Sequence, residues 1–251
     1  MTPLKTLIDN TILDRVVDAA ARAKASGVVV FDLDSTLLDN RVRQAQILRE
    51  FGVRAGLPVL AQARPQHWTS WDITEAMRAV GCTELEIEAN AEAAKAYWRS
   101  VFFTSVYCAI DDAIPGAQKY VERLVHTGVQ IAYCTGRHEE MRPGTVQSFE
   151  RLGLPVPGAG VSLIMKPTLE QSDDGWKEEA YALLKKLGTV IACFDNEPTH
   201  INGYRAHFPD AICVHLDTDH SGRPVVLRDG ILSVKRFAEE ARAAARSHEA
   251  T

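Results

Sequence analysis

Carboxylate side chains follow two apolar runs of the sequence, at points where buried strands are expected to end. Asp32 and Asp34, two residues apart, come after the run VVVF, and Asp195 ends the run TVIACFD. Burying such carboxylates without a counter-charge is costly, so we expect a cation beside them. The oxygen ligands are hard and no His or Cys cluster lies nearby in the sequence, which favours magnesium over zinc.

A second polar group follows the run VQIAYC. Thr135, Gly136 and Arg137 offer a hydroxyl, a backbone amide freed by glycine, and a fork of guanidinium donors suited to oxyanions. Two interpretations of Arg137 stay open, because its guanidinium could touch a substrate or pair with Glu139 or Glu140. The carboxyl ends of parallel strands meet at one edge of a sheet, so we expect this group to share a site with the carboxylates.

These motifs, in this order, resemble those of the haloacid dehalogenase (HAD) superfamily of aspartate-nucleophile phosphohydrolases. With h for an apolar residue, the family pattern hhhDxDST matches Val28 to Thr36, hhhhTGR matches Ile131 to Arg137, and an acidic strand end matches Phe194 to Glu197. The resemblance covers roughly residues 28 to 38 and 112 to 215. It implies a Rossmann-like core and magnesium-dependent hydrolysis of a phosphomonoester.

The resemblance also implies a role for each matching residue. Asp32 would attack phosphorus to form an aspartyl-phosphate, and Asp34 would protonate the leaving oxygen and then deprotonate the hydrolytic water. The Asp32 carboxylate, the Asp34 backbone carbonyl and Asp195 would hold Mg²⁺. Thr135, the Gly136 amide and a lysine would hold the phosphoryl oxygens. The presence of Asp34 favours phosphoryl chemistry over dehalogenation, since a departing halide needs no proton.

The family requires a lysine after the third strand, and this sequence has two candidates. We favour Lys177, which opens a predicted helix after a polar loop, over Lys166, which directly follows the run LIM. Asn196 and Glu197 stand where many relatives have a second Asp, so their role stays open; either could orient metal-bound water. The segment from His215 to His220 follows the last predicted strand, and we expect a solvated loop there rather than a second metal site.

Strands and helices are predicted to alternate along the chain as in a doubly wound α/β sheet. Continuous apolar runs predict buried parallel strands, and apolar residues at helical spacing predict amphipathic helices. The predicted strands lie at 28–33, 129–134, 161–165, 189–195 and 211–216. The predicted helices lie at 3–26, 116–127, 138–152, 175–187, 198–207 and 231–246.

About 70 residues separate the first strand from the helix that leads into the second, which is too long for a loop. Helical patterns at 41–54, 72–80 and 84–98 predict a small helical domain. This insert is predicted over 39–111, between the core segments 1–38 and 112–251. An insert at this place resembles the C1 cap of the HAD superfamily, a mobile lid that closes over the leaving group and excludes water.

Two stretches of the insert carry aromatic residues. The segment from His67 to Asp72 contains two tryptophans and a histidine beside a predicted helix start, and it could contact substrate, although ordinary packing is favoured. The stripe of Tyr97, Val101 and Phe102 is expected to belong to the core.

Composition and charge set limits on the partners of the chain. Its 251 residues are 46% hydrophobic and 24% charged, as in folded globular proteins. The formal charge of −5 provides no basic surface for duplex nucleic acid or for an anionic membrane. The five cysteines form no CxxC pair and lie mostly in apolar runs, so we expect them to be reduced and buried. No signal-peptide pattern is present, so a cytoplasmic location is expected.

The sequence therefore predicts a magnesium-dependent phosphatase that acts on a small phosphomonoester. Two alternatives stay open. One is a phosphatase acting on a nucleic-acid 3′ end, which the acidic charge disfavours. The other is a catalytically idle scaffold that binds a phosphorylated ligand or partner, which the presence of both Asp32 and Asp34 disfavours. Neither the substrate nor the oligomeric state is predicted.

Overall fold

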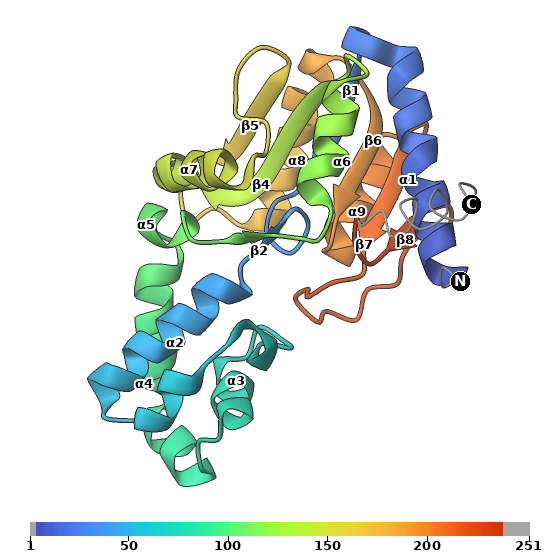
Figure 1. The fold of residues 1–251 in the computed structure, drawn as a ribbon. Helices are drawn as coiled ribbons and strands as arrows, with labels where there is room; N and C mark the ends of the chain where they lie inside the picture. The colour runs from blue at the N-terminus through green and yellow to red at the C-terminus, as the bar shows by residue number, and fades with distance from the viewer. Residues whose placement is uncertain (1–3, 238–251) are drawn as a thin grey trace, which may run out of the picture.

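The computed structural model describes residues 4–237, in which a parallel sheet is surrounded by helices (Figure 1). The six strands of this sheet lie in the order β5-β4-β1-β6-β7-β8, and each neighbouring pair is parallel. The strands are β1 (Gly27–Phe31), β4 (Gln130–His138), β5 (Val161–Lys166), β6 (Thr189–Asp195), β7 (Ile212–Leu216) and β8 (Leu232–Val234). The predicted fold class is confirmed.

Strand β1 occupies the middle of the sheet because its side chains are apolar on both faces. All the residues of its GVVVF sequence are buried. Its β-branched valines favour an extended backbone, and a strand with no polar face is stable only when both faces are covered. β1 pairs with β4 on one side and with β6 on the other.

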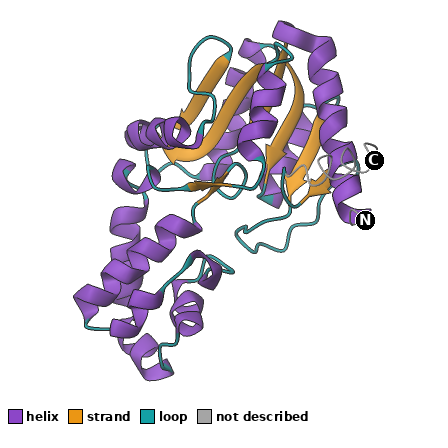
Figure 2. Cartoon of the chain, in the orientation of Figure 1, coloured by secondary structure: helices purple, strands orange, loops and turns teal. Residues whose placement is uncertain are grey.

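Helices cover both faces of the sheet (Figure 2). On one face, α1, α6 and α7 supply side chains to a core that includes Val16, Val121 and Phe149. On the other face, α8 and α9 supply a second core that includes Leu184 and Tyr204. The bounds of these helices are α1 (Leu4–Ala23), α6 (Ala117–Val125), α7 (Arg142–Leu152), α8 (Asp173–Leu187) and α9 (Pro198–His207). These five predicted helices are confirmed, with small shifts at their ends.

The C-terminal segment differs from the prediction of a helix at 231–246. Residues 232–234 instead form β8, which pairs in parallel with β7, and the Phe237 amide donates to the carbonyl oxygen of Pro115. Residues 238–246 lie outside the described part of the chain. A short apolar run such as ILSV fits a strand and a helix alike, and here the open edge of β7 offers the hydrogen-bond partners that decide for the strand.

Between β1 and α6 lies a helical segment with a buried core of its own. Its helices are α2 (Arg41–Ala55), α3 (Ile73–Val80), α4 (Glu84–Phe102) and the short α5 (Ser105–Cys108). The chain enters and leaves it through an antiparallel pair of short strands, β2 (Leu38–Asp39) and β3 (Asp112–Ala113). Figure 1 shows α2, α3 and α4 together below the sheet, reached through β2. We call residues 39–111 the helical insert.

Two expectations about the chain as a whole can be compared with the described residues. All five cysteines are free and buried, as predicted. Within residues 4–237, no helix is both long and apolar enough to cross a membrane.

The end of the helical insert packs directly on α7 at a glycine. A Cβ added to Gly144 would lie 1.7 Å from the backbone oxygen of Ser105. The Gly144 amide also donates to the Ser105 hydroxyl at 2.6 Å. Only a residue without a side chain therefore allows α5 and α7 to approach this closely.

We predict that Gly144→Ala lowers the free energy of unfolding by about 2 kcal/mol, because the added methyl group overlaps backbone that cannot move aside cheaply. The matched control is Gly158→Ala, where the new Cβ would lie 3.9 Å from the backbone oxygen of Val156. The control should change stability by less than about 0.5 kcal/mol. Urea unfolding of both variants measures the difference, and equal effects would contradict the prediction.

Candidate active site

The carboxyl ends of β1, β4 and β6 converge where the strand order of the sheet reverses. From β1 the chain passes through the helical insert to β4 and β5 on one side, and then returns to β6 on the other side. Asp32 directly follows β1, Thr135 lies near the end of β4, and Asp195 is the last residue of β6. Open α/β sheets bind their ligands at such a reversal, so the predicted residues meet at the expected place.

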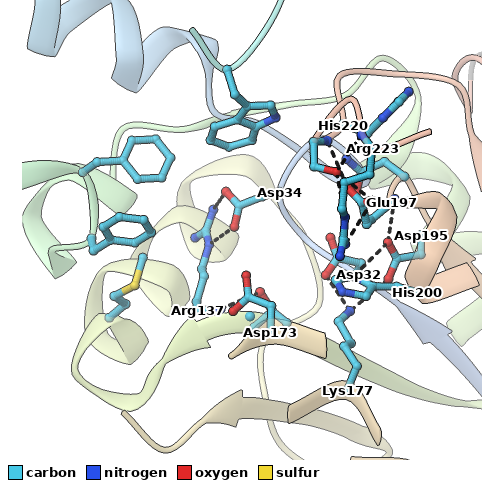
Figure 3. Close-up of a pocket in the computed structure, with 18 of the residues that line it drawn as sticks. Asp32, Asp34, Arg137, Asp173, Lys177, Asp195, Glu197, His200, His220 and Arg223 are labelled. Atoms are coloured by element: carbon cyan, nitrogen blue, oxygen red, sulfur yellow. Dashed lines mark hydrogen bonds and ion pairs between the residues drawn. The ribbon is translucent and has the colours of Figure 1, made fainter. Parts of the chain in front are cut away.

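Lys177 joins the two carboxylates of this site. Its Nζ donates to Asp32 Oδ1 at 2.8 Å and to Asp195 Oδ2 at 3.0 Å. The same Nζ donates to the Cys134 carbonyl oxygen at 2.8 Å, so all three ammonium protons have acceptors. Figure 3 shows Asp32, Lys177 and Asp195 grouped on one side of the cavity. We call these three residues the acidic triad.

The two candidate lysines of the sequence have different partners. Lys166, the last residue of β5, donates from Nζ to Asp173 Oδ1 at 2.7 Å. The structure therefore brings Lys177, and not Lys166, to the carboxylates. Asp173 also lies against Gly136, where an added Cβ would come within 2.9 Å of the Asp173 Cγ. A side chain at position 136 would therefore require the Asp173 carboxylate to move aside.

Burial raises the pKa of Asp32 to about 7, and the neighbouring charge of Asp195 acts in the same direction against the opposing effect of Lys177. Burial by itself would lower the pKa of Lys177, but the two carboxylates outweigh it and hold that pKa well above its usual value. With both carboxylates ionised, the acidic triad has one negative charge in excess. A buried site of this kind favours a further cation.

Magnesium suits the donors of the acidic triad. Mg²⁺ prefers oxygen ligands and is commonly bound by one or two carboxylates together with backbone oxygens, water or substrate phosphate. Asp32 and Asp195 are such carboxylates, and the negative charge they leave in excess attracts a cation. Among the described residues, no group of three or more His, Cys, Asp or Glu side chains is arranged to hold a metal ion, so any metal here depends on other oxygen donors as well.

Asn196 ties the loop after β1 to the loop after β6. Its amide N–H donates to Thr36 Oγ1 at 3.1 Å, and the Thr36 hydroxyl lies 3.1 Å from Asn196 Oδ1. The side-chain amide of Asn196 donates to the backbone oxygen of Asp219 at 2.5 Å. Glu197 similarly accepts from the Ser221 amide at 3.0 Å and from the Ser221 hydroxyl at 2.9 Å. In this structure both residues hold the segment after β7 against the site.

The segment from His215 to His220 is therefore not the solvated loop that we expected. His215 Nε2 lies at hydrogen-bond distance, 3.0 Å, from the Asn196 carbonyl oxygen. The Thr218 hydroxyl donates to the carbonyl oxygen of Ser35 at 2.5 Å, and His220 lines the cavity. Hydrogen bonds to the loop after β1 and to the loop after β6 account for the difference. A polar sequence alone does not reveal which partners its side chains will contact.

Asp34 belongs to a second charged group, which is separate from the acidic triad (Figure 3). Arg137 donates from Nε to Asp34 Oδ2 and from Nη2 to Asp34 Oδ1, both at 2.8 Å. Arg43 of α2 donates to the same Oδ1 at 2.8 Å. Asp111 pairs with both guanidinium groups, at 2.5 Å from Arg137 and 3.0 Å from Arg43. We call these four residues the arginine–aspartate quartet; its two positive and two negative charges balance.

Pairing within the quartet keeps Asp34 ionised. Burial would raise the pKa of Asp34, but the charges and hydrogen bonds of Arg137 and Arg43 outweigh it and hold that pKa well below its usual value. The interpretation that Arg137 pairs locally is wrong, because Glu139 pairs instead with Arg142 at 2.7 Å. The guanidinium of Arg137 reaches across the sheet edge to Asp34 and Asp111.

Several residues of the site escaped the sequence analysis. His200, in the first turn of α9, lies 2.9 Å from Asp174 and 3.8 Å from Asp195. Arg223 pairs with Asp174 at 2.6 Å. The one available signal was the position of His200, because the first turn of a helix that directly follows Asp195 must lie near that carboxylate. Arg223 and the quartet members Arg43 and Asp111 carried no comparable local signal.

No protein-family model matches the chain, and no curated protein does. Among solved structures, the chain is similar to protein tyrosine kinase A of Mycobacterium tuberculosis (19% identity, 89% of this chain and 98% of that chain, TM-score 0.47). It is similar to the class C acid phosphatase of Bacillus anthracis (15% identity, 86% of this chain and 78% of that chain, TM-score 0.48). It is also similar to a HAD-superfamily hydrolase of Ehrlichia chaffeensis (13% identity, 85% of this chain and 93% of that chain, TM-score 0.49). All three TM-scores lie below 0.5, so the function is argued from the site itself.

We predict that Lys177→Met lowers the free energy of unfolding by about 3 kcal/mol in the presence of a chelator, because it leaves two buried carboxylates without a cation. Lys166→Met is the matched control, since its partner Asp173 is half exposed, and it should cost less than about 1 kcal/mol. Urea unfolding with EDTA measures both. A loss in Lys166→Met as large as that in Lys177→Met would contradict the prediction.

Proposed function

We propose that the chain is a magnesium-dependent phosphatase of the HAD superfamily that hydrolyses a small phosphomonoester through an aspartyl-phosphate. One observation carries the proposal: a buried lysine bridges two carboxylates, Asp32 and Asp195, that end adjacent parallel strands. Burying charged groups costs desolvation free energy, and such groups cluster at sites that bind ligands or catalyse reactions. The order of the HAD-like motifs along the chain supports the same proposal.

In the first step, a carboxylate oxygen of Asp32 attacks phosphorus. A new oxygen–phosphorus bond forms, and the bond from phosphorus to the ester oxygen breaks. Lys177 favours the ionised, nucleophilic form of Asp32. With substrate bound, it would exchange one of its three hydrogen bonds for a phosphoryl oxygen, which the Thr135 hydroxyl and the Gly136 amide would also hold. In the second step, water attacks the phosphorus of the aspartyl-phosphate, which releases phosphate and restores Asp32.

The Asp32 carboxylate, the Asp34 backbone carbonyl and Asp195 would hold Mg²⁺. When bound, the ion supplies positive charge that offsets the repulsion between the Asp32 carboxylate and the phosphate group.

Asp34 would give a proton to the leaving oxygen and later take one from the attacking water. In the structure described above, both of its carboxylate oxygens accept hydrogen bonds from arginine. Protonation of Asp34 therefore requires that one of these guanidinium groups move away. Because Arg43 belongs to the helical insert, we infer that the insert acts as a cap whose movement controls this contact.

The same hydrogen bonds favour a second candidate function, a scaffold that binds a phosphorylated ligand without hydrolysing it. A carboxylate held by two arginines is a poor proton donor, and a binding protein has no need of one. The two candidates differ in whether the wild type hydrolyses the phosphate ester at all.

Release of phosphate from a generic aryl phosphate, with Mg²⁺ and with EDTA, tests the proposal. We expect turnover only with Mg²⁺, and we expect Asp32→Asn to abolish it because the amide is no nucleophile. Asp34→Asn should lower kcat by about 10² to 10⁴-fold, the usual contribution of a general acid and base. Asp210→Asn, at an exposed aspartate, is the control and should leave turnover unchanged.

Unchanged turnover in Asp32→Asn would sink the mechanism. No turnover in the wild type, together with magnesium-dependent binding of inorganic phosphate, would favour the scaffold.

A further inference from the structure

The cavity in front of Asp32 has two chemically different sides. Its volume is about 410 Å³, and its polar side includes Asp32, Lys177 and Asp195. On the other side, every described residue that the helical insert contributes to the lining is aromatic. These residues are Trp71, Trp98, Phe102 and Phe103. We call them the aromatic wall.

The rings of the aromatic wall hold one another in place. Trp98 and Phe102 are stacked with their centroids 4.4 Å apart. Trp71 meets Phe102 edge-on at 5.8 Å, and Phe103 meets Trp98 edge-on at 5.6 Å. Phe102 is 3% exposed, whereas the other three side chains are only partly buried. The wall is therefore preformed and still has aromatic surface available to a ligand.

The aromatic wall adjoins Asp34, the residue proposed to protonate the leaving oxygen. The guanidinium of Arg43 lies 3.9 Å from the centroid of Phe102 and donates to the Phe102 carbonyl oxygen at 2.9 Å. The same guanidinium donates to Asp34 at 2.8 Å. A phosphate held at Asp32 with its ester oxygen toward Asp34 would thus place the rest of the substrate against the wall.

This side of the cavity offers no unpaired charge among the residues described. Arg43 and Arg137 each pair with Asp34 and with Asp111. Met141, which completes the lining here, is apolar and buried. A leaving group that carries a carboxylate or an ammonium would lose its hydration without gaining a partner. The wall therefore favours a neutral, flat and apolar leaving group.

We propose that the site takes the phosphate monoester of an aromatic alcohol or phenol, with its ring against Trp71, Trp98 and Phe103. This substrate class rests on the phosphatase function proposed above. Hydrolysis would consume one water and release inorganic phosphate and the aromatic alcohol, so no further reactant is needed. Contacts between aromatic rings add to the burial of apolar surface and thus select the ring over an aliphatic chain.

Trp71 gives the sharpest test of this proposal, because it lies outside the buried core cluster described for the insert. Its sequence neighbour Trp68 belongs to that core and is 2% exposed. The two tryptophans of the His67 to Asp72 segment therefore have different surroundings. Of these two, Trp71 lines the cavity and Trp68 does not.

The substrates compared are benzyl phosphate and glycerol 3-phosphate, both esters of primary alcohols, so that a difference in rate reports binding more than leaving-group reactivity. We expect the wild type to have a kcat/KM at least about tenfold higher for benzyl phosphate. Trp71→Ala should lower this value about tenfold, mainly through KM, and leave glycerol 3-phosphate unchanged. Trp71→Phe should retain most of the preference. Leu85→Ala, at an exposed apolar residue of the insert, is the control.

A second measurement does not depend on turnover. Calorimetry with Mg²⁺ compares binding of benzylphosphonate and ethylphosphonate, neither of which can be hydrolysed at its phosphorus–carbon bond. The wild type should bind benzylphosphonate about tenfold more tightly, and Trp71→Ala should remove the difference.

The outcomes separate the substrate class from the phosphatase function. Equal kcat/KM for the two esters, or an equal loss for both esters in Trp71→Ala, would overturn the aromatic substrate class while leaving the phosphatase intact. Selective binding of benzylphosphonate without any turnover would overturn the phosphatase and support the aromatic ligand. If the wild type shows no turnover and binds neither phosphonate, both the phosphatase function and the aromatic substrate class are overturned.

Discussion

The candidate active site depends on one buried ammonium group that is shared by two carboxylates. Lys177 is fully enclosed, and its three hydrogen bonds reach Asp32, Asp195 and the backbone of Cys134. This arrangement requires that β1 lie between β4 and β6 and that the first turn of α8 lie beside the end of β4, because the residues come from separate segments of the chain. The apolar strands on both sides of β1 therefore do more than form a core; they set the distances within a charged site.

A second charged group links the helical insert to the sheet. The arginine–aspartate quartet is neutral as a whole and includes Arg43 from the insert and Arg137 from β4, on either side of Asp34. The acidic triad, by contrast, has an excess of negative charge. The neutral group can hold the insert in place without a further ion, whereas the acidic triad favours a cation.

Much of the sheet and part of the site could be predicted, because both leave local patterns in the sequence. Continuous apolar runs mark the buried strands, and polar residues directly after them mark the carboxyl edge. The helix expected at 231–246 shows the limit of such patterns. A short apolar run fits the spacing of a helix as well as that of a strand, and pairing with β7 makes residues 232–234 a strand. The local pairing considered for Arg137 failed for a similar reason: its partner Asp111 is distant in sequence, and no spacing rule connects the two.

The sequence by itself determined which residue types end each buried strand, and hence that Asp32, Thr135 and Asp195 share one edge. Tertiary structure alone decided that Lys177 rather than Lys166 reaches the carboxylates, that Asp34 is held by two arginines, and that the insert presents aromatic side chains to the cavity. The physical reason is the range of the interactions. Burial and backbone hydrogen bonding impose a regular spacing of apolar residues along each helix and strand, which is visible in the sequence. Side-chain pairs are selected by proximity in space, and they leave no regular spacing in the sequence.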